Sequence, residues 1–269
     1  MLLNIRKIEW LYRPVLILVV SMSLAYQALA ANEARGREQV EKSIRQITVQ
    51  INKDKKNAAL YVARAKAYFE LHEFEQAVQD YSRALKYDDK LDQAWFWRGM
   101  AQGRLGNIDE GIADLSVFIK RNPGDSVAYT KRGVRYLWKG DRENAGKDLR
   151  KAIELDPANA EAHDDLGVVL AQGGDYISAI QHFSMTVKLD PSYQKGYHNQ
   201  AMAYFVLEKD EEALASVNMA LHLDPEARNS MLLKSEILKA MGKITEAMQV
   251  HEEAMFLPEG NWSERAPVK

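Results

Sequence analysis

The chain of 269 residues contains no cysteine. Disulfide bonds, thiolate metal ligands, cysteine nucleophiles and lipids attached through a thiol are therefore excluded. An excess of positive charge is also missing, because 36 Lys and Arg residues stand against 38 Asp and Glu residues, a formal net charge of −2. Proteins that bind nucleic acid need a basic surface to displace counterions from the phosphates. We therefore expect no nucleic-acid partner.

The motifs of catalysis and metal binding are absent as well. The six histidines form neither an H-x3-H nor an H-E-x2-H pattern. The sequence His163-Asp164-Asp165 comes nearest to a metal cluster, but consecutive residues on a helix point about 100° apart and cannot converge on one ion. We predict no enzyme activity, no cofactor and no metal site.

The first thirty residues resemble a targeting segment. Residues 1–13 carry three basic side chains and one acidic one, residues 15–26 are apolar apart from two serines, and Ala28-Leu29-Ala30 follows. This pattern is typical of a secretory signal peptide, here residues 1–30, with cleavage after Ala30. An uncleaved membrane anchor with the folded part outside is the alternative, and an ordinary buried helix is a third. We expect an extracytoplasmic protein, periplasmic or secreted and bacterial, with a membrane contact only if the segment stays uncleaved.

From Ala58 onward the sequence matches itself at a shift of 34 residues. Two columns of small residues, at positions 8 and 20 of each unit, recur without exception, as Gly167 and Ala179 illustrate. Two antiparallel helices need such columns where their backbones approach closely. We divide this part of the chain into six units: 58–91, 92–125, 126–159, 160–193, 194–227 and 228–261.

Each unit contains the signals for two helices. The first is expected over positions 2–14, with a glycine at position 15 in four units, and the second over positions 18–30, where proline follows in most units. The sequence therefore predicts an all-α protein built from helical hairpins.

The spacing of these residues resembles the tetratricopeptide-repeat (TPR) family. Its signature W-x2-L-G-x2-Y, then A-x3-F, then P has the same period, and the fourth unit shows it as Leu166-Gly167, Leu170, Ala179, Phe183 and Pro191. The resemblance covers residues 58–261 and implies a right-handed superhelical solenoid of TPR hairpins. It also implies a role in holding other proteins or peptides.

Residues outside the six units are expected to close the ends of the array. In residues 31–57, Val40, Ile44, Ile47 and Ile51 occupy the apolar slots of a second helix, so we interpret this segment as an amino-terminal capping helix, or half repeat. A free amphipathic helix is the alternative. Residues 262–269 form a short tail.

The resemblance implies where a ligand binds. In proteins similar to this one the first helices line the concave face, with positions 2, 5, 9, 12 and 13 pointing into the groove. Phe96 and Trp138 are the strongest candidates, unless neighbouring first helices bury them. The predicted groove residues are Val62, Phe69, Phe96, Met100, Arg104, Val134, Leu137, Trp138, Val168, His198, Met202 and Phe205.

The predicted function is a non-catalytic interaction scaffold or adaptor of the cell envelope, which binds a peptide or helix in an apolar groove for assembly of an envelope complex. The basic and amide side chains with which related co-chaperones hold a terminal carboxylate are missing, since only Asn199 matches. Two alternatives remain. One is a self-associating structural protein, or homodimer, that uses Ile244, Met248 and Met255 of the sixth unit, a strip that Trp262 could otherwise cover. The other is an accessory subunit of an envelope enzyme.

Overall fold

The computed structural model describes residues 34–258, and within this range it consists of helices joined by short turns. It confirms the prediction of an all-α solenoid of helical hairpins. The predicted signal peptide and the tail 262–269 lie outside the described residues. The chain divides into two compact units between Asp89 and Lys90, which we call the N-terminal unit and the C-terminal unit.

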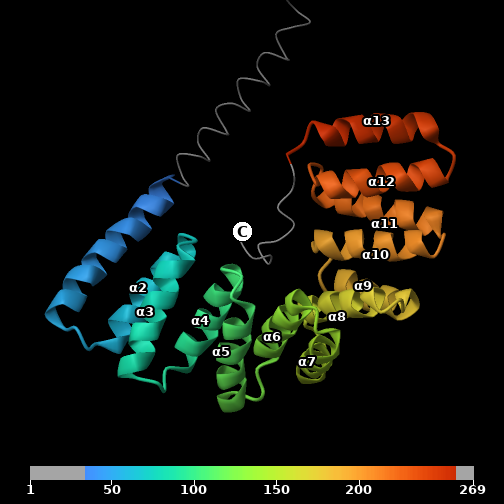
Figure 1. Cartoon of the computed structure of the whole chain (residues 1–269). Helices are drawn as coiled ribbons and strands as arrows, with labels where there is room; N and C mark the ends of the chain where they lie inside the picture. Colours follow the sequence, from blue (N-terminus) through green and yellow to red (C-terminus); the bar gives the residue numbers. More distant parts are fainter. Residues whose placement is uncertain (1–33, 259–269) are drawn as a thin grey trace, which may run out of the picture. The chain divides into compact units, whose positions relative to one another are not determined.

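Residues 34–53 form one helix, and six hairpins follow it (Figure 1). The helices of the hairpins are α2 (Ala58–Glu70) and α3 (Phe74–Tyr87), α4 (Asp92–Arg104) and α5 (Ile108–Arg121), α6 (Ser126–Lys139) and α7 (Arg142–Leu155), α8 (Ala160–Gln172) and α9 (Tyr176–Leu189), α10 (Gln194–Val206) and α11 (Asp210–Leu223), and α12 (Arg228–Ala240) and α13 (Ile244–Met255). The first helix of each hairpin begins at position 1 of a 34-residue unit. The division of the chain at these boundaries stays a prediction.

The turn inside each hairpin has one fixed backbone conformation at position 15. Gly106, Gly140 and Gly174 have φ between 81° and 86°, in the left-handed region that glycine adopts without steric cost. The two hairpins without glycine use the same conformation, with φ of 61° at His72 and 57° at Glu208. The turn geometry is therefore kept even where the sequence does not favour it.

The two columns of small residues lie where the helices of each hairpin cross, as predicted. Gly99 and Gly111 face each other in the second hairpin, and a Cβ added to either would lie 3.0 Å from the carbonyl oxygen of the other. In the fourth hairpin an added Cβ on Gly167 would lie 2.5 Å from the ring of Phe183. Larger side chains at these positions would push the helices apart.

An arginine–aspartate pair links the two helices in each of the first three hairpins. Arg98 donates from Nε and Nη2 to the two carboxylate oxygens of Asp114, both at 2.7 Å. Arg64 with Asp80 and Arg132 with Asp148 repeat this pair at positions 7 and 23. We call this bidentate contact the hairpin ion pair.

The later hairpins replace the hairpin ion pair. Leu166 and His182 occupy its positions in the fourth, and in the fifth Ser216 Oγ donates to Gln200 Oε1 at 3.0 Å. The position-7 side chain also reaches position 25 of the preceding unit, as Arg132 reaches Ser116 Oγ at 2.9 Å. Arg64 makes this contact with Thr48 Oγ1 at 3.0 Å. Residues 34–53 thus stand where the second helix of a preceding hairpin would.

Within the C-terminal unit the first helices contact one another in sequence, α4 with α6, α6 with α8, α8 with α10, and α10 with α12. They form one layer, and each is backed by the second helix of its own hairpin. No helix among residues 34–258 has the length and apolar character needed to cross a membrane.

Candidate functional site

A groove runs over the first helices of the last three hairpins, α8, α10 and α12. Two adjoining pockets hollow it, with volumes of about 310 and 530 Å³, and both are lined by Asn199, Met202 and Val206 of α10. Met202 is 48% exposed and Val206 is 50% exposed, so this part of α10 presents apolar surface to solvent. We call this region the C-terminal groove.

The smaller pocket lies between α8 and α10 and reaches the second helix α9. We call it the inner pocket, and its walls are Val168, Ala171, Gln172, Tyr176, Phe183, Asn199, Met202, Ala203 and Val206. The larger one, the outer pocket, is lined by His198, Asn199, Met202, Phe205, Val206, Asn229 and Leu233. Among residues 34–258, no Asp, Glu, Lys or Arg lines either pocket, and the polar groups are amides, one phenol and one imidazole.

The imidazole of the groove is held neutral by its surroundings. His198 is 6% exposed, and burial lowers its pKa from 6.5 to about 4. The charge of Asp164 raises this pKa, whereas the charge of Lys195 lowers it further. Nδ1 of His198 lies 3.0 Å from Ser230 Oγ, and this oxygen accepts a hydrogen bond from Gln194 Nε2 at 3.0 Å. The ring therefore lies fixed in the floor of the groove.

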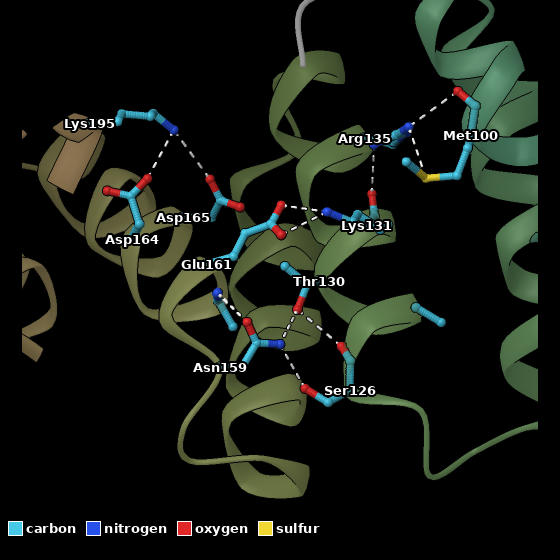
Figure 2. Close-up of polar contacts among 12 residues, drawn as sticks. Met100, Ser126, Thr130, Lys131, Arg135, Asn159, Glu161, Asp164, Asp165 and Lys195 are labelled. Carbon is cyan, nitrogen blue, oxygen red and sulfur yellow. Dashed lines mark hydrogen bonds and ion pairs between the residues drawn. The ribbon is translucent and has the colours of Figure 1, made fainter. Parts of the chain in front are cut away.

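Charged side chains gather beside the groove, on α6, α8 and α10, and they pair with each other (Figure 2). Lys131 Nζ lies 2.7 Å from both carboxylate oxygens of Glu161. One helix further, Lys195 Nζ lies 2.9 Å from Asp164 Oδ2 and 3.6 Å from Asp165 Oδ1. Each pair joins the first helices of two neighbouring hairpins and so fixes the spacing of the layer.

Asn199 connects this charged cluster to the groove. Its Nδ2 donates to Asp164 Oδ1 at 2.8 Å, while the residue lines both pockets. The buried carboxylate of Asp164 therefore restricts the orientation of the amide. Ordering of this kind lowers the entropy cost of binding a ligand.

Four of the predicted groove residues come together here. Val168, His198, Met202 and Phe205 all line the C-terminal groove. Whether they bind a partner stays a prediction, because the structure contains no ligand.

Phe96, predicted at position 5 to point into the groove, lies in the core of the second hairpin. Phe96 is only 8% exposed and packs against Phe118, with ring centroids 5.2 Å apart. Position 5 is buried in the next hairpins too, at Thr130, Asp164 and His198, although His198 also lines the outer pocket. Phe96 shares a buried cluster with Leu115 and Ile119 of α5 and with Ala128 of α6. Val134, at position 9, is buried as well.

The other predicted residues of the C-terminal unit are half-buried outside the C-terminal groove. The guanidinium of Arg135 lies 4.8 Å from the ring centroid of Trp138, and its Nη2 contacts the carbonyl oxygen and the sulfur of Met100 at 3.4 Å. Leu137 packs against the core of the third and fourth hairpins, and Arg104 is also half-buried. These side chains are engaged within the protein itself.

Two predicted residues belong to the N-terminal unit. Val62 and Phe69 of α2 are half-buried, and Phe69 packs edge-on against Phe74 with ring centroids 5.2 Å apart.

Position 6 of the first helix was not among the predicted groove positions. Asn199 and Leu233 both occupy it and both line the outer pocket. The signal was present in the sequence, since position 6 lies one helical turn from positions 2 and 9 on the same face. Asn229, at position 2, completes this row.

Two other features of the C-terminal unit bear on function. Apolar side chains lie exposed on α13 and just after it, at Ile244, Met248, Met255 and Phe256, the last of them 84% exposed.

His163 and His182 meet with their Nδ1 atoms 3.0 Å apart, and burial lowers the pKa of both imidazoles. Within residues 34–258 no three His, Cys, Asp or Glu side chains are grouped to hold a metal ion.

Comparison with known protein families finds matches over much of the hairpin array. A family described as TPR repeat matches residues 65–106 and 133–173, and one described as tetratricopeptide repeat matches residues 93–125. None of the curated protein sequences is similar to the chain.

Solved structures share the fold at low sequence identity. A tetratricopeptide repeat protein from Parabacteroides merdae is 18% identical with a TM-score of 0.68, over 82% of this chain and 88% of that one. YrrB, described as a TPR protein with an unusual peptide-binding site, is 22% identical with a TM-score of 0.54, over 69% of this chain and 95% of the YrrB chain. The APC/C hetero-tetramer Cut9–Hcn1 is 18% identical with a TM-score of 0.64, over 81% of this chain but only 47% of its own.

Proposed function

Because the chain belongs to the tetratricopeptide-repeat family, whose members are non-catalytic interaction scaffolds, we propose that it holds a segment of another protein in the C-terminal groove. The observation that carries the proposal is the exposed apolar surface of Met202 and Val206 between two pockets. Exposed apolar patches bordered by polar groups commonly mark protein contacts.

The groove suits a peptide segment in either of two forms. An amphipathic helix could lay its apolar face on α10, or an extended segment could run across α8, α10 and α12. In either form, the groove offers amides to the polar atoms of the segment and apolar walls to its side chains. YrrB, which has the same fold, is described as binding a peptide, and this supports the choice of ligand class.

The place of action that we propose is the cell envelope, where the protein serves the assembly of a complex. This part rests on the signal-like pattern of residues 1–30. It is tested by fractionating the producing cells and determining the amino terminus of the protein. A chain that starts at Ala31 in the extracytoplasmic fraction would agree with the proposal, and a full-length chain in the cytosol would contradict it.

The binding site is tested with a pair of matched variants. Met202→Glu places a charge in the groove, whereas Met219→Glu makes the same change on α11 at a residue of similar exposure, 42%. Each variant, as the tagged chain in its own cells, is compared with the parent for captured partners, after circular dichroism has shown that both are folded. We expect the partner to be lost with Met202→Glu and kept with Met219→Glu. The same partner on all three proteins would contradict the proposal.

A second candidate function is self-association through the sixth hairpin, which the exposed apolar residues of α13 favour. Sedimentation of the parent and of a Met248→Glu variant tests it. A dimer that Met248→Glu converts to monomer would support it, whereas a parent that stays monomeric at micromolar concentration would exclude it.

A further inference from the structure

We infer that the inner pocket is an anchor site for one bulky, uncharged apolar side chain of the bound segment, and that this pocket decides which segments are held. The inference rests on the proposed function, since it names the chemistry of the ligand at the same groove.

The depth of the inner pocket supports an anchor. Its lining runs from Phe183 of α9, which belongs to the core and is 2% exposed, to Met202 and Val206 of α10, which are 48% and 50% exposed. Small residues make the space, since Ala171 of α8 and Ala203 of α10 form its sides. A side chain that enters from the groove would therefore reach the core of the fourth hairpin.

The volume fits a large side chain. An apolar cavity of about 150 Å³ holds one benzene ring, and the inner pocket has about twice that volume, 310 Å³. A phenyl, indole, leucyl or methionyl group fills such a space far better than a methyl group does. Because packing contacts and apolar burial both scale with contact area, larger side chains gain affinity here.

The polarity of the walls excludes charged side chains. The carboxylates and ammonium groups nearby, Asp164, Asp165 and Lys195, pair with one another beside the groove and do not line the pocket. A buried charge without a counter-ion is strongly disfavoured. In the part of the chain that the structure describes, the polar walls are Gln172, Asn199 and the phenol of Tyr176, which can form hydrogen bonds with the backbone of the segment. The favoured occupant is therefore an apolar stretch, not an acidic or phosphorylated one.

The test uses a displayed library of random 12-residue peptides, selected on the full chain. We expect the selected peptides to share one Phe, Trp, Leu or Met, and its replacement by Ala in a synthetic peptide to weaken binding about tenfold or more in isothermal titration calorimetry. This substitution leaves the protein unchanged, so the result does not depend on the folding of a variant.

Matched protein variants give the second readout. Ala171→Leu fills the inner pocket, and Ala215→Leu makes the same change at an exposed residue of α11. We expect about a tenfold loss of affinity for Ala171→Leu and no more than about twofold for Ala215→Leu.

Selected peptides without a bulky apolar residue, or with a charged one in its place, would overturn the inference. So would unchanged affinity for Ala171→Leu. If binding were then still lost with Met202→Glu, the groove itself would stand and only the anchor would fail. If Met202→Glu also bound normally, or no peptide were selected, the proposed function would fail with it.

Discussion

At position 15, the turn of the repeat requires a backbone conformation that is unfavourable for residues other than glycine. Glu208 is held at φ 57°, where a side chain costs about 1 kcal/mol and glycine costs almost nothing. Other hairpins have glycine here, so the conformation is a property of the turn and not of the glutamate.

The first prediction follows from this conflict. Glu208→Gly should stabilise the protein by about 0.5–1 kcal/mol and raise the melting temperature by about 1–4 °C. Thermal unfolding followed by circular dichroism measures it. Gly174→Ala, at φ 86°, is the converse change and should lower the melting temperature. A Glu208→Gly variant that melts below the parent would show that the turn does not impose this backbone conformation.

The second prediction concerns Ala179, a single residue at a helix crossing. It is fully buried where α8 and α9 cross, so Ala179→Leu should destabilise the protein by about 1–3 kcal/mol through overpacking. The denaturant midpoint measures the loss, with Ala215→Leu as the exposed control. Equal midpoints for the two variants would mean that the crossing lies elsewhere.

At the scale of the element, the hairpin ion pair holds two helices together by a contact that is strong only when complete. Asp114 is almost fully buried and takes both of its short hydrogen bonds from Arg98. Removal of one partner of a buried pair leaves a charge without compensation. The fifth hairpin shows that an uncharged pair, Gln200 with Ser216, can occupy the same positions.

The third prediction replaces the charged pair of the second hairpin with the uncharged pair of the fifth. Arg98→Ala should cost about 3 kcal/mol of stability, because the carboxylate of Asp114 stays buried. The double variant Arg98→Gln, Asp114→Ser, which copies the fifth hairpin, should recover more than half of that loss. Urea unfolding of the parent, the single and the double variant measures this. A double variant less stable than the single one would contradict the account of the pair.

Sequence alone predicted the helices because their determinants are local. The small residues at positions 8 and 20, and the glycine at position 15, act within one hairpin and can be recognised in its own 34 residues. Phe96 could not be placed in this way, because the buried cluster to which it belongs also includes Ala128 of the next hairpin. The hairpin ion pair was not predicted, because arginine at position 7 and its aspartate lie 16 residues apart and meet only when the two helices pack.

At the scale of the whole molecule, the histidines link stability to pH. His198 has a pKa of about 4 in the folded protein against 6.5 in the unfolded chain, and burial also lowers the pKa of His163 and His182. As pH falls below 6.5, the unfolded chain binds protons before the folded one does. Stability is therefore complete above pH 6.5 and is lost as pH falls toward 4.

The fourth prediction concerns how much folding stability is lost as the pH falls. His198 alone should contribute up to about 3 kcal/mol of destabilisation between pH 7 and pH 4. Denaturant unfolding at a series of pH values measures it. His198→Gln should flatten the dependence, whereas His222→Gln, at an exposed position, should leave it unchanged. Equal pH profiles for the parent and His198→Gln would contradict the burial of a neutral imidazole.

The groove could be only partly predicted, because it arises from several hairpins together. Val168, Met202 and Phe205 were found from their positions on the first helices, but the inner pocket also needs Phe183 and Tyr176 of α9. Those two residues look like ordinary core positions in the sequence. Only the packing of α8, α9 and α10 brings them to one opening.

The most direct test of the central claim is site-specific crosslinking in the producing cells. A photoreactive amino acid replaces Val206 in the C-terminal groove and, in a second protein, Met219 on α11. The account predicts that Val206 yields a crosslink to a partner protein and that Met219 yields none. Crosslinks from Met219 alone would contradict it, because they would place the contact on the second helices and leave the groove without a ligand.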